Sequence, residues 1–119
     1  MSIRVELSEL RDIAARQAPF AYLLTVSDDE SAHAVAITPR IGAGSITCSV
    51  GNRSTQNALA RPKVSLVWPP AEPGDYSLIV DGRAALDGEV MEITPERAVR
   101  HRPAPGGGSD CAPVPLEPN

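Results

Sequence analysis

Four polar residues at the start of a predicted helix carry the most visible chemistry of this sequence. They follow Gly51 and are Asn52, Arg53, Ser54 and Thr55. A guanidinium, hydroxyl groups and the unpaired backbone N–H groups of a helix N-terminus are donors that hold a phosphate. Alternatively, Ser54 only caps the helix and Arg53 is solvated. The residues alone leave both interpretations open: a phosphate site or an ordinary helix start.

A strand before this cluster and a strand after it must position the four residues. Apolar and polar residues alternate over Ser45–Val50, so one face of this strand is buried and the other is polar. Gly51 permits a tight turn from strand to helix. Pro62 marks the end of the helix, before a strand over Lys63–Trp68. We therefore predict a strand–helix–strand unit with the polar cluster at its first junction.

The rest of the chain predicts a mainly β protein. A helix is expected over the apolar spacing from Val5 to Ala14, with Ser8 as its cap and Pro19 as its end. Hairpin-linked strands with few helices indicate an antiparallel barrel or sandwich, here with six strands and two short helices. The other four strands are predicted over Phe20–Val26, Ala32–Ile41, Tyr76–Leu86 and Glu89–His101. Alternation predicts a core of Leu23, Val35, Ile37, Ile46, Cys48, Val50, Val64, Leu66, Leu78 and Val80.

Composition limits the possible classes of protein. The chain has 119 residues and a formal charge of -4, and its basic residues are scattered, which argues against nucleic acid as a partner. No apolar run approaches the ~20 residues of a membrane span, and no signal segment is recognised, so we expect a cytoplasmic protein. Cys48 and Cys111 fit no metal, redox or disulfide pattern. No hydrolase constellation is present, and no catalytic residue is assigned.

The composition changes near Arg102. Residues 1–102 are expected to form one barrel domain, and residues 103–119 are a Pro/Gly-rich tail. Such a segment buries too little apolar surface to offset its ordering entropy. We expect the tail to contribute little to the fold, although it could pack over a cofactor or another subunit.

Small side chains line two neighbouring strand faces. Ala34, Ala36 and Thr38 lie on one predicted strand, and Thr47 and Ser49 lie on the next. A flat ring could rest on such a surface and meet backbone N–H and C=O groups. The alternative is that these faces meet solvent or a second subunit.

The order of these segments resembles the pyridoxamine 5′-phosphate oxidase-like family, the FMN-binding split β-barrels. The resemblance covers roughly residues 5 to 100, and it is most specific in NRSTQNALARPKVSLVW and in SLIVDGRA. It implies a homodimer that binds two flavin-type cofactors, FMN or alternatively a deazaflavin, at the subunit interface. The implied phosphate residues are Asn52, Arg53, Ser54, Thr55 and Asn57.

The resemblance also implies where the isoalloxazine ring lies and what covers it. The implied ring-binding residues are Ala36, Ile37 and Thr38 on one strand and Thr47, Cys48 and Ser49 on the next, with Trp68 of the partner subunit as a cover. The cluster departs from the family pattern because Arg53 is its single positive charge. The chain also lacks the crossover helix and basic C-terminal segment of the vitamin-processing oxidases, so that particular activity is not expected.

Three functions are consistent with this resemblance. The first is a flavin- or deazaflavin-dependent oxidoreductase, whose cofactor carries the hydride. The second is a non-catalytic flavin or tetrapyrrole binder, and the third is a dimeric interaction module without a ligand. His33 and His101 lie at strand ends, where a histidine is more often solvated than engaged with a ligand.

Overall fold

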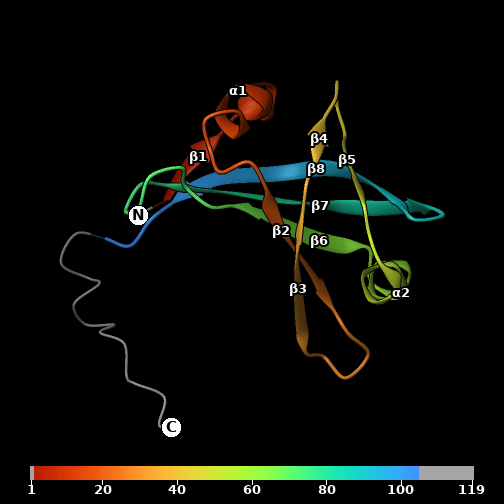
Figure 1. Ribbon diagram of the computed structural model, residues 1–119. Coiled ribbons are helices and arrows are strands. Elements are labelled where there is room, and N and C mark those ends of the chain that lie inside the picture. Colours follow the sequence, from red (N-terminus) through yellow and green to blue (C-terminus); the bar gives the residue numbers. More distant parts are fainter. Residues whose placement is uncertain (1, 105–119) are drawn as a thin grey trace, which may run out of the picture.

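Eight antiparallel strands form one strongly curled sheet in the computed structural model, which describes residues 2–104 (Figure 1). Two helical segments, η1–α1 and α2, accompany the sheet. The strands are β1 (Ser2–Val5), β2 (Ala21–Val26), β3 (Ala32–Ile37), β4 (Arg40–Ile41), β5 (Ile46–Ser49), β6 (Lys63–Trp68), β7 (Ser77–Asp87) and β8 (Val90–His101). The helical segments are the 3-10 turn η1 (Leu7–Glu9), α1 (Leu10–Ala14) and α2 (Asn52–Ala60).

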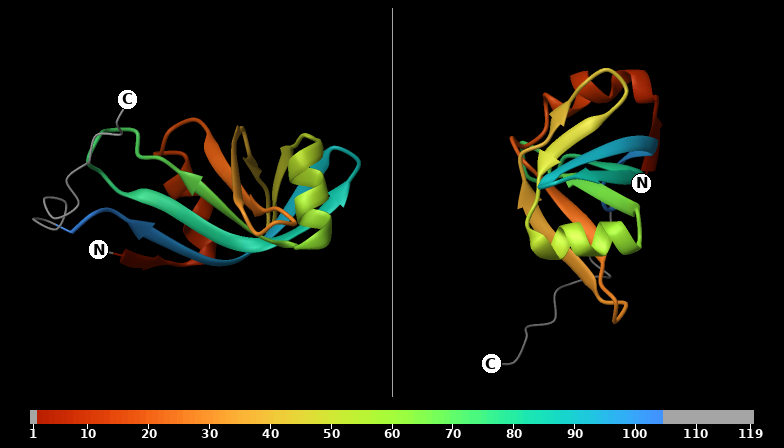
Figure 2. Two further views of the ribbon diagram at one scale, coloured as in Figure 1. Left: turned by 90° about the horizontal axis from the view of Figure 1, so that it is seen from below. Right: turned by 90° about the vertical axis from the view of Figure 1, so that its right-hand side faces the viewer.

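The two end strands of the sheet are consecutive in the sequence. The strand order is β3-β2-β6-β7-β8-β5-β4, and β1 pairs with β8 beside this path. Only Thr38 and Pro39 separate β3 from β4, so the chain passes directly from one sheet edge to the other. This link joins the two ends of the curled sheet without pairing them, and Figure 2 shows the curl from two further directions. The predicted mainly β split barrel with two short helices is confirmed.

The alternation of apolar and polar residues along the strands predicted the core residues correctly. Nine of the ten predicted residues are buried, and Val35 is partly buried and packs against them. Leu23, Leu66, Leu78 and Val80 have no exposed surface, as expected for inward positions on β2, β6 and β7. The partner strand β8 adds Met91 and Ile93, which are also fully buried.

The helix predicted from Val5 to Ala14 was wrong at its N-terminal end. Val5 lies in β1, where it pairs with Ala98 of β8, and helical structure begins only at Leu7. Ser8 is not a cap, because it lies inside η1, whose N-cap is Glu6. The cause is tertiary: β8 extends beyond β5 and offers a free edge to β1, and this pairing overrides local helical spacing.

The predicted strand Ala32–Ile41 is divided into β3 and β4 at Thr38 and Pro39. Proline lacks the N–H that a continuous ladder needs, which fits a break at this position. Together with β1, this division gives eight strands where six were predicted. None of the helices within residues 2–104 is long and apolar enough to cross a membrane. The tail prediction falls mainly on residues 105–119, outside the described residues, and stays a prediction.

Candidate functional site

A hollow of about 310 Å³ lies where β3 and β5 separate. We call it the split pocket. Its walls come from one strand, from the end of another and from the first turn of α2. The lining residues are His33, Val35, Ala36 and Ile37 of β3, Ser49 of β5, Val50, Gly51, and Asn52, Arg53 and Ser54 of α2.

The register of β4 and β5 explains why the pocket forms there. Arg40 pairs with Thr47, and continuing this register would place Ile37 opposite Val50 and Val35 opposite Asn52. Instead, the chain turns into α2 after Val50, and β3 has β2 as its one strand partner within residues 2–104. The second edge of β3 therefore presents backbone N–H and C=O groups to the pocket, where a flat polar ligand could meet them.

The first turn of α2 has no side-chain cap. Gly51 is the N-cap residue, and Ser54 is the third residue of the helix, with 2% of its surface exposed. The alternative interpretation of Ser54 as the cap is therefore wrong. The first N–H groups of an uncapped helix need partners from outside the helix, and here they lie at the pocket wall.

The tight turn from strand to helix does not require a glycine at position 51, contrary to the sequence-based expectation. The φ of Gly51 is -89° and its ψ is -175°, an extended conformation that any residue adopts. A Cβ at this position would meet nothing within 4 Å. The turn into α2 therefore does not depend on the conformational freedom of glycine.

Arg53 is exposed, and within the described chain its guanidinium forms no hydrogen bond or ion pair. It lies between the split pocket and a second hollow of about 580 Å³ that includes Asp28 and Asp29. Hydrogen bonds from the Ser31 hydroxyl and N–H lower the pKa of Asp29, and the charge of Arg53 contributes to the same effect. Asp29 is therefore ionised at neutral pH and offsets part of the positive charge of Arg53.

Asp28 is occupied elsewhere. Arg61 donates to its carboxylate at 2.6 Å and to the Val26 carbonyl at 2.8 Å. These contacts hold the acidic turn, residues 27–31 between β2 and β3, against the end of α2. Of the arginines near this turn, Arg53 is thus the one available to a ligand.

Asn57 and Thr55 face partners in their own chain. The Asn57 amide donates to the hydroxyl oxygens of Thr25 at 3.0 Å and Ser27 at 3.2 Å, and Asn57 is 4% exposed. The Thr55 hydroxyl donates to the Gly51 carbonyl at 2.9 Å. Neither residue lines the split pocket. Asn57 therefore positions α2 against β2, and direct contact with a phosphate stays a prediction for both.

The other predicted ring residues are dispersed. Burial raises the pKa of the Cys48 thiol to about 11, so this sulfur is protonated at neutral pH. Thr47 is half-buried and pairs with Arg40 and Glu92, and Thr38 is exposed in the link between β3 and β4. Trp68 is 4% exposed and lines a hollow beside α1 rather than the split pocket. The structure brings together six predicted residues in the pocket: Ala36, Ile37, Ser49, Asn52, Arg53 and Ser54.

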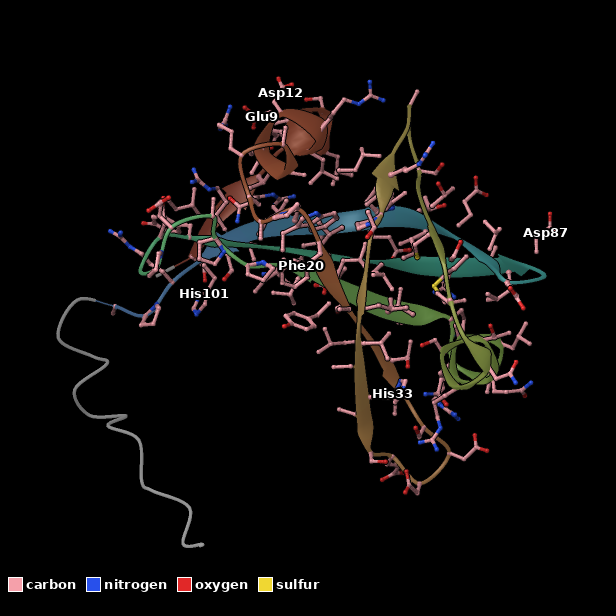
Figure 3. The ribbon with its side chains drawn as sticks, viewed as in Figure 1. Glu9, Asp12, Phe20, His33, Asp87 and His101 are labelled. Carbon is pink, nitrogen blue, oxygen red and sulfur yellow. The ribbon has the colours of Figure 1, made fainter. Side chains whose placement is uncertain are left out.

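His33 is the pocket residue that the sequence interpretation placed in solvent. It lies on β3 on the side of α2 (Figure 3). Its Nδ1 is buried and has no hydrogen-bond partner within residues 2–104. The alternation along β3 could have indicated this position, because His33 lies on the same face of the strand as the inward residues Val35 and Ile37.

Comparison with known proteins identifies the relatives of this chain. No model of a known protein family matches the sequence. An uncharacterized protein from Mycobacterium bovis and one from Mycobacterium tuberculosis are each 39% identical to it, over 72% of this chain and 72% of theirs. The chain belongs to the family of these mycobacterial proteins.

Solved structures define the class of fold. A Listeria innocua protein, provisionally assigned as a pyridoxamine 5′-phosphate oxidase, is similar with a TM-score of 0.63 and 19% identity, over 78% of this chain and 96% of that one. An F420 reductase has a TM-score of 0.61 and 13% sequence identity, and the match covers 73% of this chain and 94% of that one. The haem storage protein HutZ from Vibrio cholerae has a TM-score of 0.58 and 12% sequence identity, and the match covers 78% of this chain and 92% of that one. The fold is thus the pyridoxamine 5′-phosphate oxidase-like split barrel.

Proposed function

We propose that the split pocket binds a flavin-type cofactor, FMN or a deazaflavin, and that the protein is an oxidoreductase acting through it. The observation that carries this proposal is the meeting of Arg53, an uncapped helix start and an unpaired strand edge in one hollow. The phosphate would bind to Asn52, Arg53 and Ser54, and the ring would lie along Ala36, Ile37 and Ser49. When bound, the cofactor supplies hydride chemistry, while the chain binds and orients it.

The size of the pocket supports a dimeric form of this site. Ligand pockets commonly occupy about 300–1,000 Å³, so the 310 Å³ of the split pocket is at the small end. From this size we infer that one chain encloses only part of a flavin. We infer that a second copy of the chain supplies the remaining wall, so that the protein is a homodimer.

Titration of the purified protein with FMN, and separately with a deazaflavin, tests the proposal. Arg53→Ala should weaken binding by about 10- to 150-fold, because a charge-assisted hydrogen bond contributes about 1.5–3 kcal/mol. Arg16→Ala is the matched control, since Arg16 is exposed, lies after α1 and is remote from the pocket residues. Asp29→Asn should strengthen binding, because it removes the negative charge beside Arg53.

The outcomes separate the alternatives. Equal affinities for the wild type, Arg53→Ala and Arg16→Ala would mean that the phosphate does not bind at α2. Absence of binding to either cofactor would contradict the proposal. If the reduced bound cofactor is reoxidised by a quinone faster than the free cofactor, catalysis is supported, and equal rates would favour a binding protein.

A tetrapyrrole-binding protein is the second candidate. It is favoured by the fold shared with a haem storage protein and by the unpartnered imidazole nitrogen of His33 in the pocket. Haem titration tests this candidate, because a bound haem shows a shifted Soret band. A protein that binds neither haem nor either flavin would support the third function, a dimeric interaction module.

A further inference from the structure

A buried polar atom without a partner requires an explanation, because most buried polar atoms in folded proteins are hydrogen-bonded. Nδ1 of His33 is such an atom within residues 2–104. The nearby polar groups are satisfied: Asn57 donates to Thr25 and Ser27. His33 pairs across the sheet with Thr25 and stands beside this network, and its Nδ1 has no hydrogen-bond partner among residues 2–104.

His33 lies at the Arg53 end of the split pocket. The pocket extends along β3 from His33 to Ile37 and along the facing chain from Ser49 to Ser54. Continuing the antiparallel register of β4 and β5 would place Ile37 towards Val50 and His33 towards the first turn of α2. An anionic group held by Arg53 would therefore be beside the imidazole.

We propose that His33 contacts the phosphate of the ligand and, when protonated, supplies the second positive charge that the Arg53 cluster lacks. This inference rests on the proposed function. A dianionic phosphate is held more strongly by two cations than by one. Histidine changes its charge near pH 6.5 in its ordinary state, so binding should depend on pH. The pocket then selects a phosphate-bearing ligand more strongly at pH 6 than at pH 8.

Few other charged groups bear on this imidazole. Arg53 of α2 shares the pocket and is positive, while Asp29 lies beyond Arg53 and is negative. Asp28 is paired with Arg61. The neighbouring residues Thr25 of β2 and Ser49 of β5 do not titrate in this range. Histidine is the residue type whose charge ordinarily changes in this pH range, and His33 is the histidine that lines the pocket.

The test compares FMN affinity across pH 5.5–8.5 for the wild type, His33→Asn and His101→Asn. We expect His33→Asn to weaken binding about tenfold at pH 5.5 and less than about twofold at pH 8.5. The second ionisation of the phosphate lies near pH 6 and also changes affinity. This ionisation acts on all three proteins alike. The ratio of the wild-type affinity to the variant affinity at each pH therefore isolates the contribution of His33.

His101 is the matched control because it is exposed, bonds to the Ser2 hydroxyl and lies far from His33 in Figure 3. A ratio for His33→Asn that stays constant with pH would overturn the proposal, because it would show a purely structural role. If FMN binds, Arg53→Ala weakens it and the His33→Asn ratio stays near one, this inference is wrong while the proposed function stands.

A second measurement keeps the inference testable if the wild type binds no flavin. NMR titration of both imidazoles in inorganic phosphate and in chloride of equal ionic strength reports their pKa values directly. We expect phosphate to raise the pKa of His33 and leave that of His101 unchanged, because a nearby anion favours the imidazolium. Equal values for His33 in the two salts would refute the inference.

Discussion

Asn57 joins the candidate pocket to the core of the barrel. Its amide bonds to Thr25 and Ser27 of the sheet side, while Arg53, four residues earlier, lines the pocket. Residues four apart in a helix lie one turn apart on the same side. The buried contact of Asn57 therefore fixes how the start of α2 meets β3.

We predict that Asn57→Ala lowers the free energy of unfolding by about 1–3 kcal/mol, because it leaves the buried Thr25 hydroxyl without its donor. The measurement is urea unfolding followed by circular dichroism. Gln56→Ala is the control, since Gln56 is the exposed neighbour on the same helix and should change stability by less than about 0.5 kcal/mol. Equal unfolding midpoints for the two variants would contradict the anchoring role.

At the scale of elements, the long hairpin β7–β8 carries the curl of the sheet. Its register shifts between Asp81 and Gly82, and Gly82 pairs with Pro95. A register shift of this kind bends the strands and increases their twist. A Cβ on Gly82 would lie 2.6 Å from the Thr94 carbonyl oxygen and 2.8 Å from Cγ2 of Ile93. Glycine is required here for close packing of the two strands.

Gly82→Ala should therefore destabilise the protein by about 1–3 kcal/mol, the usual cost of overpacking. Gly51→Ala provides the control, because a Cβ there meets nothing within 4 Å and the backbone φ is -89°. Thermal unfolding of both variants gives the comparison. If Gly82→Ala melts with the wild type and Gly51→Ala melts lower, the close approach does not limit stability.

At the scale of the whole molecule, the outer face of the barrel near β3 is apolar and exposed. Tyr22 is 42% exposed and Val26 39%, and their cross-strand neighbours on β3 are Ala36 and Ala32. The Tyr22 ring meets Phe20 edge to face, with centroids 5.3 Å apart. An apolar surface of this kind favours association with another protein surface.

We predict a homodimer, with a light-scattering mass near twice the 12.5 kDa of the chain. Tyr22→Asp should shift the mass towards the monomer, because it places a charge on the contact face. Ile3→Asp is the control, since Ile3 is 46% exposed on the edge strand β1. A wild-type mass of 12.5 kDa at micromolar concentration would contradict the dimer and the shared pocket.

The sequence by itself determined the features that depend on local patterns. Alternation identified the inward residues of β2, β6 and β7, and the polar cluster followed by Pro62 located α2. Local backbone preference and side-chain periodicity act over a few residues, so one segment contains all the information. The same local reading located Arg53 and Ser54 at the start of the helix.

Only the tertiary structure decided which of these features meet. The pairing of β1 with β8 joins residues about 95 apart in the chain, and no local pattern encodes it. Likewise, Trp68 lies beside α1, Asn57 bonds to β2, and His33 lines the same pocket as the first turn of α2. Such contacts depend on strand order and on the curl of the sheet, which bring residues distant in sequence to a common surface.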